Sequence, residues 1–380
     1  MSLSSPLKSA LGGLLAAAAA MGVGRFVFTP ILPPMSHALG LTTAQAGWIA
    51  SANYVGYLLG ALGASHAQVS RRPRQWMIAA LTVSALSTLA MGLSQDLAAF
   101  LILRLVGGVA SAIVLVCASA LVLRQVVEAG RPGLSALHFA GVGIGVAGSA
   151  ILVSLLNSAG VDWRGLWIAS GLIALVAAAG AVLLIPPASP APPVQAHAAK
   201  PLPGFVPLVL AYGLFGFGYV ITATFLVALT RAAPAARPME PFVWLIVGVT
   251  ATPTILLWDR IGRRMGSGPA FALACLVEAV GVALSVLEPN VWGAGLAAAL
   301  VGGTYMGITA LGLQQARLRA VDPAKALALM TAAFGLGQII GPLFAGQLSQ
   351  LTGNLTLASL IAAGALLLAA ALTARLPDKA

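Results

Sequence analysis

Four ionisable side chains stand within long apolar segments of this 380-residue chain: Arg25, Arg104, His138 and Glu278. An arginine guanidinium can bind a carboxylate through two parallel hydrogen bonds. A buried glutamic acid or a histidine can take up and release a proton. The residue types therefore suggest recognition of an anion and transfer of protons, and the next question is which elements hold them.

The composition places these segments in lipid. The chain is 59% hydrophobic and only 8% charged, with a mean hydropathy of +0.98, whereas a soluble domain carries roughly 25% charged residues. It has a net charge of +11, but basic patches with interleaved aromatic residues are absent, which argues against nucleic acid. The two cysteines, Cys117 and Cys275, lie in apolar runs and suggest neither disulfides nor a metal site.

The hydropathy pattern predicts an all-α polytopic membrane protein with about twelve transmembrane helices, at about 20 residues per crossing. The predicted spans are 10–32, 45–65, 76–94, 97–123, 133–157, 163–185, 205–230, 241–258, 268–287, 290–315, 325–348 and 354–375. The apolar runs are continuous rather than alternating, which favours helices over a barrel. A Pro/Ala-rich stretch divides the chain into an N-terminal six-helix bundle (1–185), a cytoplasmic linker (186–203) and a C-terminal six-helix bundle (204–380).

The basic residues predict the orientation. If the N-terminus is cytoplasmic, the segments on that side hold fifteen of the twenty Lys and Arg residues and the outer loops hold three; Arg25 and Arg104 lie within spans. Lys and Arg accumulate in cytoplasmic loops. We therefore expect both termini in the cytoplasm of a bacterial inner-membrane protein.

Glycine motifs recur between the two halves at a nearly constant offset. Gly22-Val-Gly24 corresponds to Gly216-Phe-Gly218, and Gly141-Val-Gly143 corresponds to Gly335-Leu-Gly337. Both offsets are 194 residues. This parallel repeat suits a transporter that rocks two bundles about a site near the midplane.

Several motifs resemble the major facilitator superfamily. Asp259-Arg260-Ile-Gly-Arg263-Arg264 is similar to the loop motif of that superfamily, and Arg104-x-x-x-Gly108 is similar to its fourth-span arginine motif. The resemblance narrows to the YbfB/YjiJ branch through the segments Gly22-x-Gly24-Arg25-Phe26 and Tyr212–Tyr219. It implies that spans 1, 4, 7 and 10 line a central cavity. It also implies that Asp259, with Arg260 and Arg263, forms a gating latch; the alternative is a solvated charge cluster.

Arg25 and Arg104 are expected at similar depth. At 1.5 Å per residue, Arg25 lies ~22 Å up the first span and Arg104 ~10 Å down the fourth. A charge at the bilayer centre costs roughly 2.5–3.5 kcal/mol, so each needs a partner or a wet cavity. For Arg25 we favour contact with an anionic substrate. For Arg104 we favour hydrogen bonds to helix-end carbonyls, with gating or substrate contact as the alternative.

Further polar and aromatic residues share helix faces that suit a cavity wall. The predicted substrate-binding residues, besides Arg25, are Asn53, Tyr57, Tyr212, Tyr219, Tyr305 and Gln338. Glu278 and His138 are candidates for proton coupling. The alternative is a structural hydrogen-bonding role, which is equally supported for Glu278 and favoured for His138. Pro342 is expected to bend the eleventh span.

We therefore expect a monomeric secondary transporter that binds a small solute, either an organic anion or an amphipathic compound, and works by alternating access. No cofactor is expected, because the ATP-binding motif G-x-x-x-x-G-K-[ST] is absent from the sequence. A proton gradient and the solute's own gradient both remain open as driving forces. A facilitator, a channel and a membrane enzyme are the alternatives, the last disfavoured by the lack of clustered acids, histidines or a nucleophile with a base.

Overall fold

The computed structural model describes residues 5–64, 66–187, 202–320 and 322–376, and every regular element within these ranges is helical. In chain order the α-helices are α1 (Ser5–Ala17), α2 (Phe28–Leu39), α3 (Thr43–Ala64), α4 (Ala67–Arg71), α5 (Pro73–Ala90), α6 (Leu97–Glu128), α7 (Ser135–Ser158), α8 (Trp163–Leu184), α9 (Phe205–Ala232), α10 (Glu240–Ala251), α11 (Thr254–Met265), α12 (Ser267–Leu287), α13 (Val291–Gly302), α14 (Tyr305–Arg319), α15 (Pro323–Thr352) and α16 (Thr356–Thr373). A π-helical segment, Ala18–Val23, follows α1, and short 3₁₀ turns lie at Met91–Leu93, Pro132–Leu134 and Arg237–Met239.

Ten helical segments of the described chain are long and apolar enough to cross a membrane, or eleven when the bent pair α10–α11 is one span. The remaining predicted span is α3, which has 22 residues but carries Asn53, Tyr54 and Tyr57. It packs between α6 of its own half and α15 of the other. Neighbouring helices cover the polar side chains of α3, so the twelve predicted segments correspond to helices, broken helices or helix pairs.

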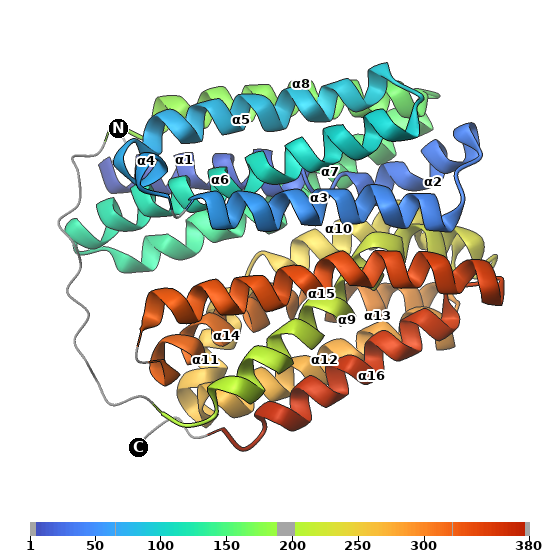
Figure 1. The fold of residues 1–380 in the computed structure, drawn as a ribbon. Coiled ribbons are helices and arrows are strands. Elements are labelled where there is room, and N and C mark those ends of the chain that lie inside the picture. The colour runs from blue at the N-terminus through green and yellow to red at the C-terminus, as the bar shows by residue number, and fades with distance from the viewer. Residues whose placement is uncertain (1–4, 65, 188–201, 321, 377–380) are drawn as a thin grey trace.

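The helices form two groups, α1–α8 and α9–α16, which lie one above the other in Figure 1. Both chain ends are at the same end of the molecule (Figure 1), which we call the terminal face; the other end is the opposite face. Most of the linker that we predicted, 186–203, lies outside the described residues. Among the described residues, hydrogen bonds join the halves at two places: Thr29 Oγ1 donates to the Ala223 carbonyl (2.7 Å), and Ser51 Oγ donates to the Ile339 carbonyl (2.8 Å).

The repeated glycines allow close helix contacts, as expected for small residues in membrane helices. A Cβ atom on Gly22 would clash with the backbone of Gly145 in α7, and one on Gly337 would clash with the Gly213 carbonyl in α9. Pro342 lies inside α15, which continues as one helix across it. A Cβ on Gly47 of α3 would clash with the Pro342 carbonyl, so the two halves touch backbone to backbone there.

Three spans are interrupted. The first span was predicted as one run over 10–32, but it extends over Ser5–Leu39 and changes from α to π geometry at Ala18, then breaks before α2. The eighth bends by 48° between α10 and α11, where Pro253 cannot donate a backbone hydrogen bond. The tenth breaks between α13 and α14 at Gly303–Thr304. Interrupted helices expose backbone polar groups in the membrane interior, where they need partners.

Candidate functional site

The guanidinium of Arg25 lies in an aromatic cage at the break of the first span. Its central carbon is 4.0 Å from the ring centroid of Tyr57, 4.8 Å from that of Tyr54 and 5.4 Å from that of Phe26. The side chain is only 3% exposed. Within the described residues, its Nε and Nη2 atoms have no hydrogen-bond acceptor, and Arg25 takes part in no ion pair. The cage therefore stabilises the cation through ring faces and leaves two donors unused.

Arg104 closes the break from α6. Its Nη1 donates to the Gly24 carbonyl at 3.1 Å, and its Nη2 donates to the Arg25 carbonyl at 3.0 Å. These carbonyls lie where the first span leaves regular helix, so a helical N–H donor is not available to them. The predicted depth match between the two arginines agrees with this contact, and the geometry favours the structural interpretation of Arg104.

Asn53 anchors α3 to the same place. Its side-chain nitrogen donates to the Arg104 carbonyl at 2.9 Å, while its Oδ1 atom is buried without a donor among the described residues. A Cβ on Gly108 would clash with the Asn53 carbonyl, so α3 and α6 pack with their backbones close together. This contact brings Tyr54 and Tyr57 to Arg25.

The second half contributes a stack of aromatic rings. Tyr219 in α9 stacks on Phe334 in α15 with ring centroids 5.8 Å apart and an angle of 5°, and on Tyr305 in α14 at 5.9 Å and 4°. Phe215 joins the same stack at 5.1 Å from Tyr219, and Tyr212 continues it at 5.8 Å from Phe215. Offset aromatic pairs at such distances contribute beyond their buried area, by about 0.5–1.5 kcal/mol each.

Hydrogen bonds within the second half hold this stack, and electrostatic interactions link it to Arg25. Gln338 Nε2 donates to the Tyr219 hydroxyl, and Gln338 Oε1 is buried without a donor in the described chain. The Tyr212 hydroxyl donates to the Thr309 carbonyl at 3.4 Å. Arg25 interacts electrostatically with Tyr219 and Tyr305. The halves thus meet in one cluster, which contains all five tyrosines of the chain, Tyr54, Tyr57, Tyr212, Tyr219 and Tyr305.

The space between the two aromatic groups is nearly filled. A void of about 10 Å³ is lined by Phe26, Tyr219, Trp244 and Tyr305, among others. One water needs about 10–15 Å³ measured in this way. A solute that binds here must therefore move the rings apart.

Glu278 lies behind the break in the tenth span. It is fully buried in α12, and neither carboxyl oxygen has a hydrogen-bond partner by distance and angle within the described ranges. The Thr304 hydroxyl adjoins this carboxyl, but donates its proton to the Leu300 carbonyl at 2.7 Å. Glu278 also interacts electrostatically with Tyr305. The carboxyl is therefore next to the aromatic cluster rather than on its wall.

His138 and the predicted latch are elsewhere. His138 Nε2 is 2.9 Å from Ser119 Oγ within the first half, and the ring lies against the Gly13 backbone; this supports the structural alternative. Asp259 forms an ion pair with Arg263 at 2.6 Å, one turn further along α11, and both side chains are exposed. Arg260 is exposed on the same helix. The predicted latch would pair Asp259 with a neighbouring span. In this structure Asp259 pairs within its own helix.

Sequence reasoning did not select Tyr54 or Phe26 as site residues. Asn53 and Tyr57 are four residues apart and share the face of α3 that the sequence predicts to line the cavity. Tyr54 lies off that face. The structure uses Tyr54 and Tyr57 together, at i, i+3 spacing, around one guanidinium. One sequence feature could have indicated this cage. It is the pair of tyrosines three residues apart in the span that follows the one containing Arg25.

Two packed groups of long apolar helices define a polytopic membrane protein of the major facilitator fold. The chain belongs to the family described as uncharacterised MFS-type transporter YbfB, whose family model matches residues 17–374. It is therefore an integral membrane protein that carries a solute across the membrane. No curated protein matches the sequence.

Solved structures share the fold. A mutant of the nucleoside transporter NupG is 16% identical, with a TM-score of 0.76 over 97% of this chain and 99% of that one. A bacterial homologue of the human lysosomal transporter Spinster, in an inward-facing and unoccupied conformation, is 15% identical, with a TM-score of 0.69 over 98% and 95%. At these identities the likeness concerns the fold alone. The family and both structures are those of transporters rather than enzymes.

Proposed function

We propose that this protein is a secondary transporter of a small organic anion, which binds to Arg25 and crosses by alternating access. The observation that carries the proposal is the buried guanidinium of Arg25, which has two donors without an acceptor among the described residues and no ion-pair partner there. A buried charge without compensation is strongly unfavourable. A carboxylate from solution would supply the missing charge and both acceptors at once.

The arrangement of the two halves supports alternating access. The cation comes from the first half, while Tyr219, Tyr305 and Gln338 come from the second. An anion that touches both can close the halves on one side or the other, as expected for parallel six-helix repeats. The complete site lies within one chain, so a monomer is sufficient. The charge bias supports a cytoplasmic terminal face and an inner-membrane location.

Glu278 supports proton coupling. It is a buried acid beside Thr304 and Tyr305, at the break of a span that contributes to the site. Proton relays in transporters use such intramembrane carboxyl groups. Uptake into proteoliposomes that is unchanged by collapse of the pH gradient would contradict this coupling and leave the solute gradient as the driving force.

A planar neutral solute, such as a nucleoside, is the second candidate. The rings of Tyr219, Phe334 and Tyr305 are within 5° of parallel in each stacked pair, and Gln338 has a buried, unused acceptor. A flat heterocycle could insert into this stack and donate to Gln338. The nucleoside transporter NupG has the same fold.

A ligand panel separates the two candidates. The purified protein would be heated with benzoate, with benzamide as the neutral match, and with uridine or adenosine. Ligand binding raises the apparent stability by RT ln(1 + [L]/Kd), or about 2.7 kcal/mol at a hundred times Kd. We expect benzoate to stabilise the protein more than benzamide, and Arg25→Ala to reduce the difference.

Controls complete the test. Arg164→Ala removes an arginine at the start of α8, outside the cage, and should respond to benzoate as the wild type does. An equal response to benzoate and benzamide, or a benzoate response of full size in Arg25→Ala, would contradict the anion proposal. Stabilisation by the nucleosides alone would favour the second candidate.

A further inference from the structure

A second cavity lies between the halves near the opposite face. It has a volume of about 180 Å³, and we call it the outer cavity. The first half lines it with residues of α2 and α7, including Ser154 and Asn157, and the second half lines it with residues of α9 and α10, including Arg231 and Glu240. One water needs about 10–15 Å³ measured in this way, so the outer cavity has room for a small molecule.

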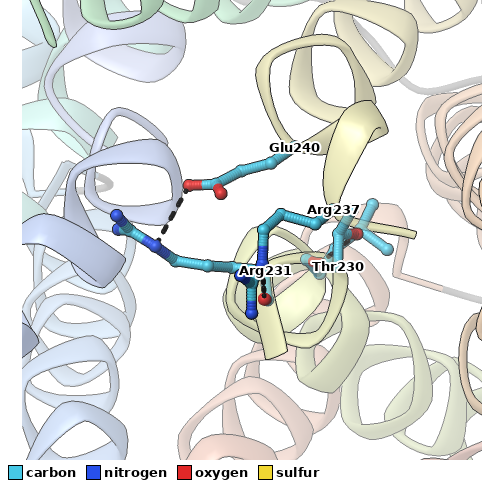
Figure 2. A network of polar contacts seen from close by, with 5 residues as sticks. Thr230, Arg231, Arg237 and Glu240 are labelled. Atoms are coloured by element: carbon cyan, nitrogen blue, oxygen red, sulfur yellow. Dashed lines mark hydrogen bonds and ion pairs between the residues drawn. The ribbon is translucent and has the colours of Figure 1, made fainter. Parts of the chain in front are cut away.

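Arg231 is incompletely paired in this cavity. Its Nε is 3.6 Å from Glu240 Oε1, which is a long ion pair, and its Nη1 is buried without an acceptor among the described residues. Arg237 donates from Nε to the Arg231 carbonyl at 3.1 Å and adds a second positive charge nearby. Figure 2 shows Arg231 extended toward the blue ribbon of the first half, with Glu240 reaching down from the adjoining helix. Two arginines face one carboxylate, so the local balance is positive.

The outer cavity lies beside the Arg25 site. Trp244 lines both the outer cavity and the small void between Phe26, Tyr219 and Tyr305. The Trp244 and Phe26 rings are 6.4 Å apart, and Trp244 is almost fully buried. Trp244 and Phe26 therefore link the wall of the outer cavity to the wall of the cage.

We infer that the outer cavity is a second anion-binding site, in which Arg231 holds a small carboxylate before or after it occupies the Arg25 cage. The inference rests on the proposed function, because it takes the same class of solute. The free Nη1 of Arg231 supplies one donor, and the long contact with Glu240 is one that a competing carboxylate can replace. Ser154 and Asn157 supply neutral polar groups from the facing helix, so the bound anion bridges the two halves.

Thiol labelling tests the site without knowledge of the natural solute. Ser154→Cys places a thiol in the cavity wall, and the native Cys117 and Cys275 are buried. Two methanethiosulfonate reagents, one with a sulfonate and one with a trimethylammonium group, react with the same thiolate, so the ratio of their rates reports the local potential. We expect the sulfonate preference to fall about tenfold when Arg231→Gln is added, and to persist with Arg231→Lys.

Matched controls locate the effect. Arg164→Gln removes the same charge elsewhere and should leave the ratio unchanged. Asn157→Cys repeats the measurement from a second wall position in case Ser154→Cys does not fold. An unchanged ratio in Arg231→Gln, or thiols at both positions that react with neither reagent, would overturn the inference.

Protection by benzoate separates this inference from the proposed function. Saturating benzoate should slow labelling of Ser154→Cys both with Arg25 present and in Arg25→Ala, but not in Arg231→Gln. Protection that disappears in Arg25→Ala would place the anion at the cage alone and overturn the outer site. Protection that persists there, together with an unchanged thermal response of Arg25→Ala to benzoate, would retain the outer site while the cage proposal fails.

Discussion

Arg25 and Arg104 are the same residue type at the same depth, within a few ångströms of each other, yet their surroundings differ. Arg104 directs both terminal nitrogens at backbone carbonyls of the first span, at 3.1 and 3.0 Å. Arg25 faces ring carbons, and its Nε and Nη2 have no acceptor within the described chain. A buried arginine that completes a broken helix is part of the framework. A buried arginine without acceptors is available to a ligand.

The largest expected effect is on the framework. Arg104→Met removes two charge-assisted hydrogen bonds and leaves the Gly24 and Arg25 carbonyls without donors in a membrane interior. Hydrogen bonds to charged groups contribute about 1.5–3 kcal/mol each, so we expect a loss of about 3–6 kcal/mol in the free energy of unfolding. Denaturant titration of the protein in detergent measures it.

Arg104→Lys tests whether the planar shape of the guanidinium is required. Lysine has a single ammonium group and cannot present the planar fork that spans two carbonyls. We expect it to recover less than half of the loss. Wild-type stability in Arg104→Met would remove the structural role of Arg104 and with it the contrast with Arg25.

Arg25→Met should act in the opposite direction. Replacing buried ionic groups with apolar ones of similar size is often neutral or stabilising, and we expect a gain of about 1–2 kcal/mol in the absence of ligand. The same variant should respond less to benzoate than the wild type does. If it unfolds as readily as Arg104→Met, the two arginines play one structural role and the cage is not a binding site.

A smaller effect is expected at the wall of the cage. Tyr57 has the shortest distance to the guanidinium, 4.0 Å. Tyr57→Leu removes a ring face worth about 1 kcal/mol to the buried cation, so we expect a loss of about that size in the free energy of unfolding. Tyr57→Phe keeps the ring and should be nearly as stable as the wild type; denaturant titration measures both variants. Equal losses in the two variants would assign the effect to the hydroxyl instead.

The smallest effect is expected at the loop motif. Asp259 and Arg263 are paired at 2.6 Å but are exposed, and exposed ion pairs contribute about 0–1 kcal/mol. Asp259→Asn should therefore change the unfolding free energy by less than about 1 kcal/mol. A larger loss, or a strong change in transport rate with unchanged stability, would indicate that Asp259 binds a neighbouring span in another conformation, as the predicted latch requires.

Hydropathy and the rise per residue were sufficient to predict the helical class, the order of the spans and the common depth of Arg25 and Arg104. They were not sufficient to predict the break in the first span. The run around Gly22 and Gly24 is uniformly apolar, and the bonds that satisfy its free carbonyls come from Arg104, some eighty positions later in the chain. The residues next to the break do not identify such a distant partner.

The sequence was also not sufficient to predict the surroundings of each charged residue within the membrane. Arg25, Arg104 and Glu278 all occupy apolar runs, so the same free-energy cost of placing a charge in the membrane applies to all three. Only their neighbours distinguish a bonded arginine, a caged arginine and a carboxyl beside a broken helix. Close packing at Gly337, in contrast, fits its place in a repeated glycine motif, because close helix packing requires small residues.

The gathering of every tyrosine of the chain in one cluster has a spectroscopic consequence. Biosynthetic replacement of tyrosine by 3-fluorotyrosine would introduce five fluorine nuclei, all of them within the cluster that joins the two halves. A fluorine NMR spectrum of the otherwise unaltered protein would then contain no signal from distant reporters. Opening and closing of the halves would appear directly as exchange among those five resonances.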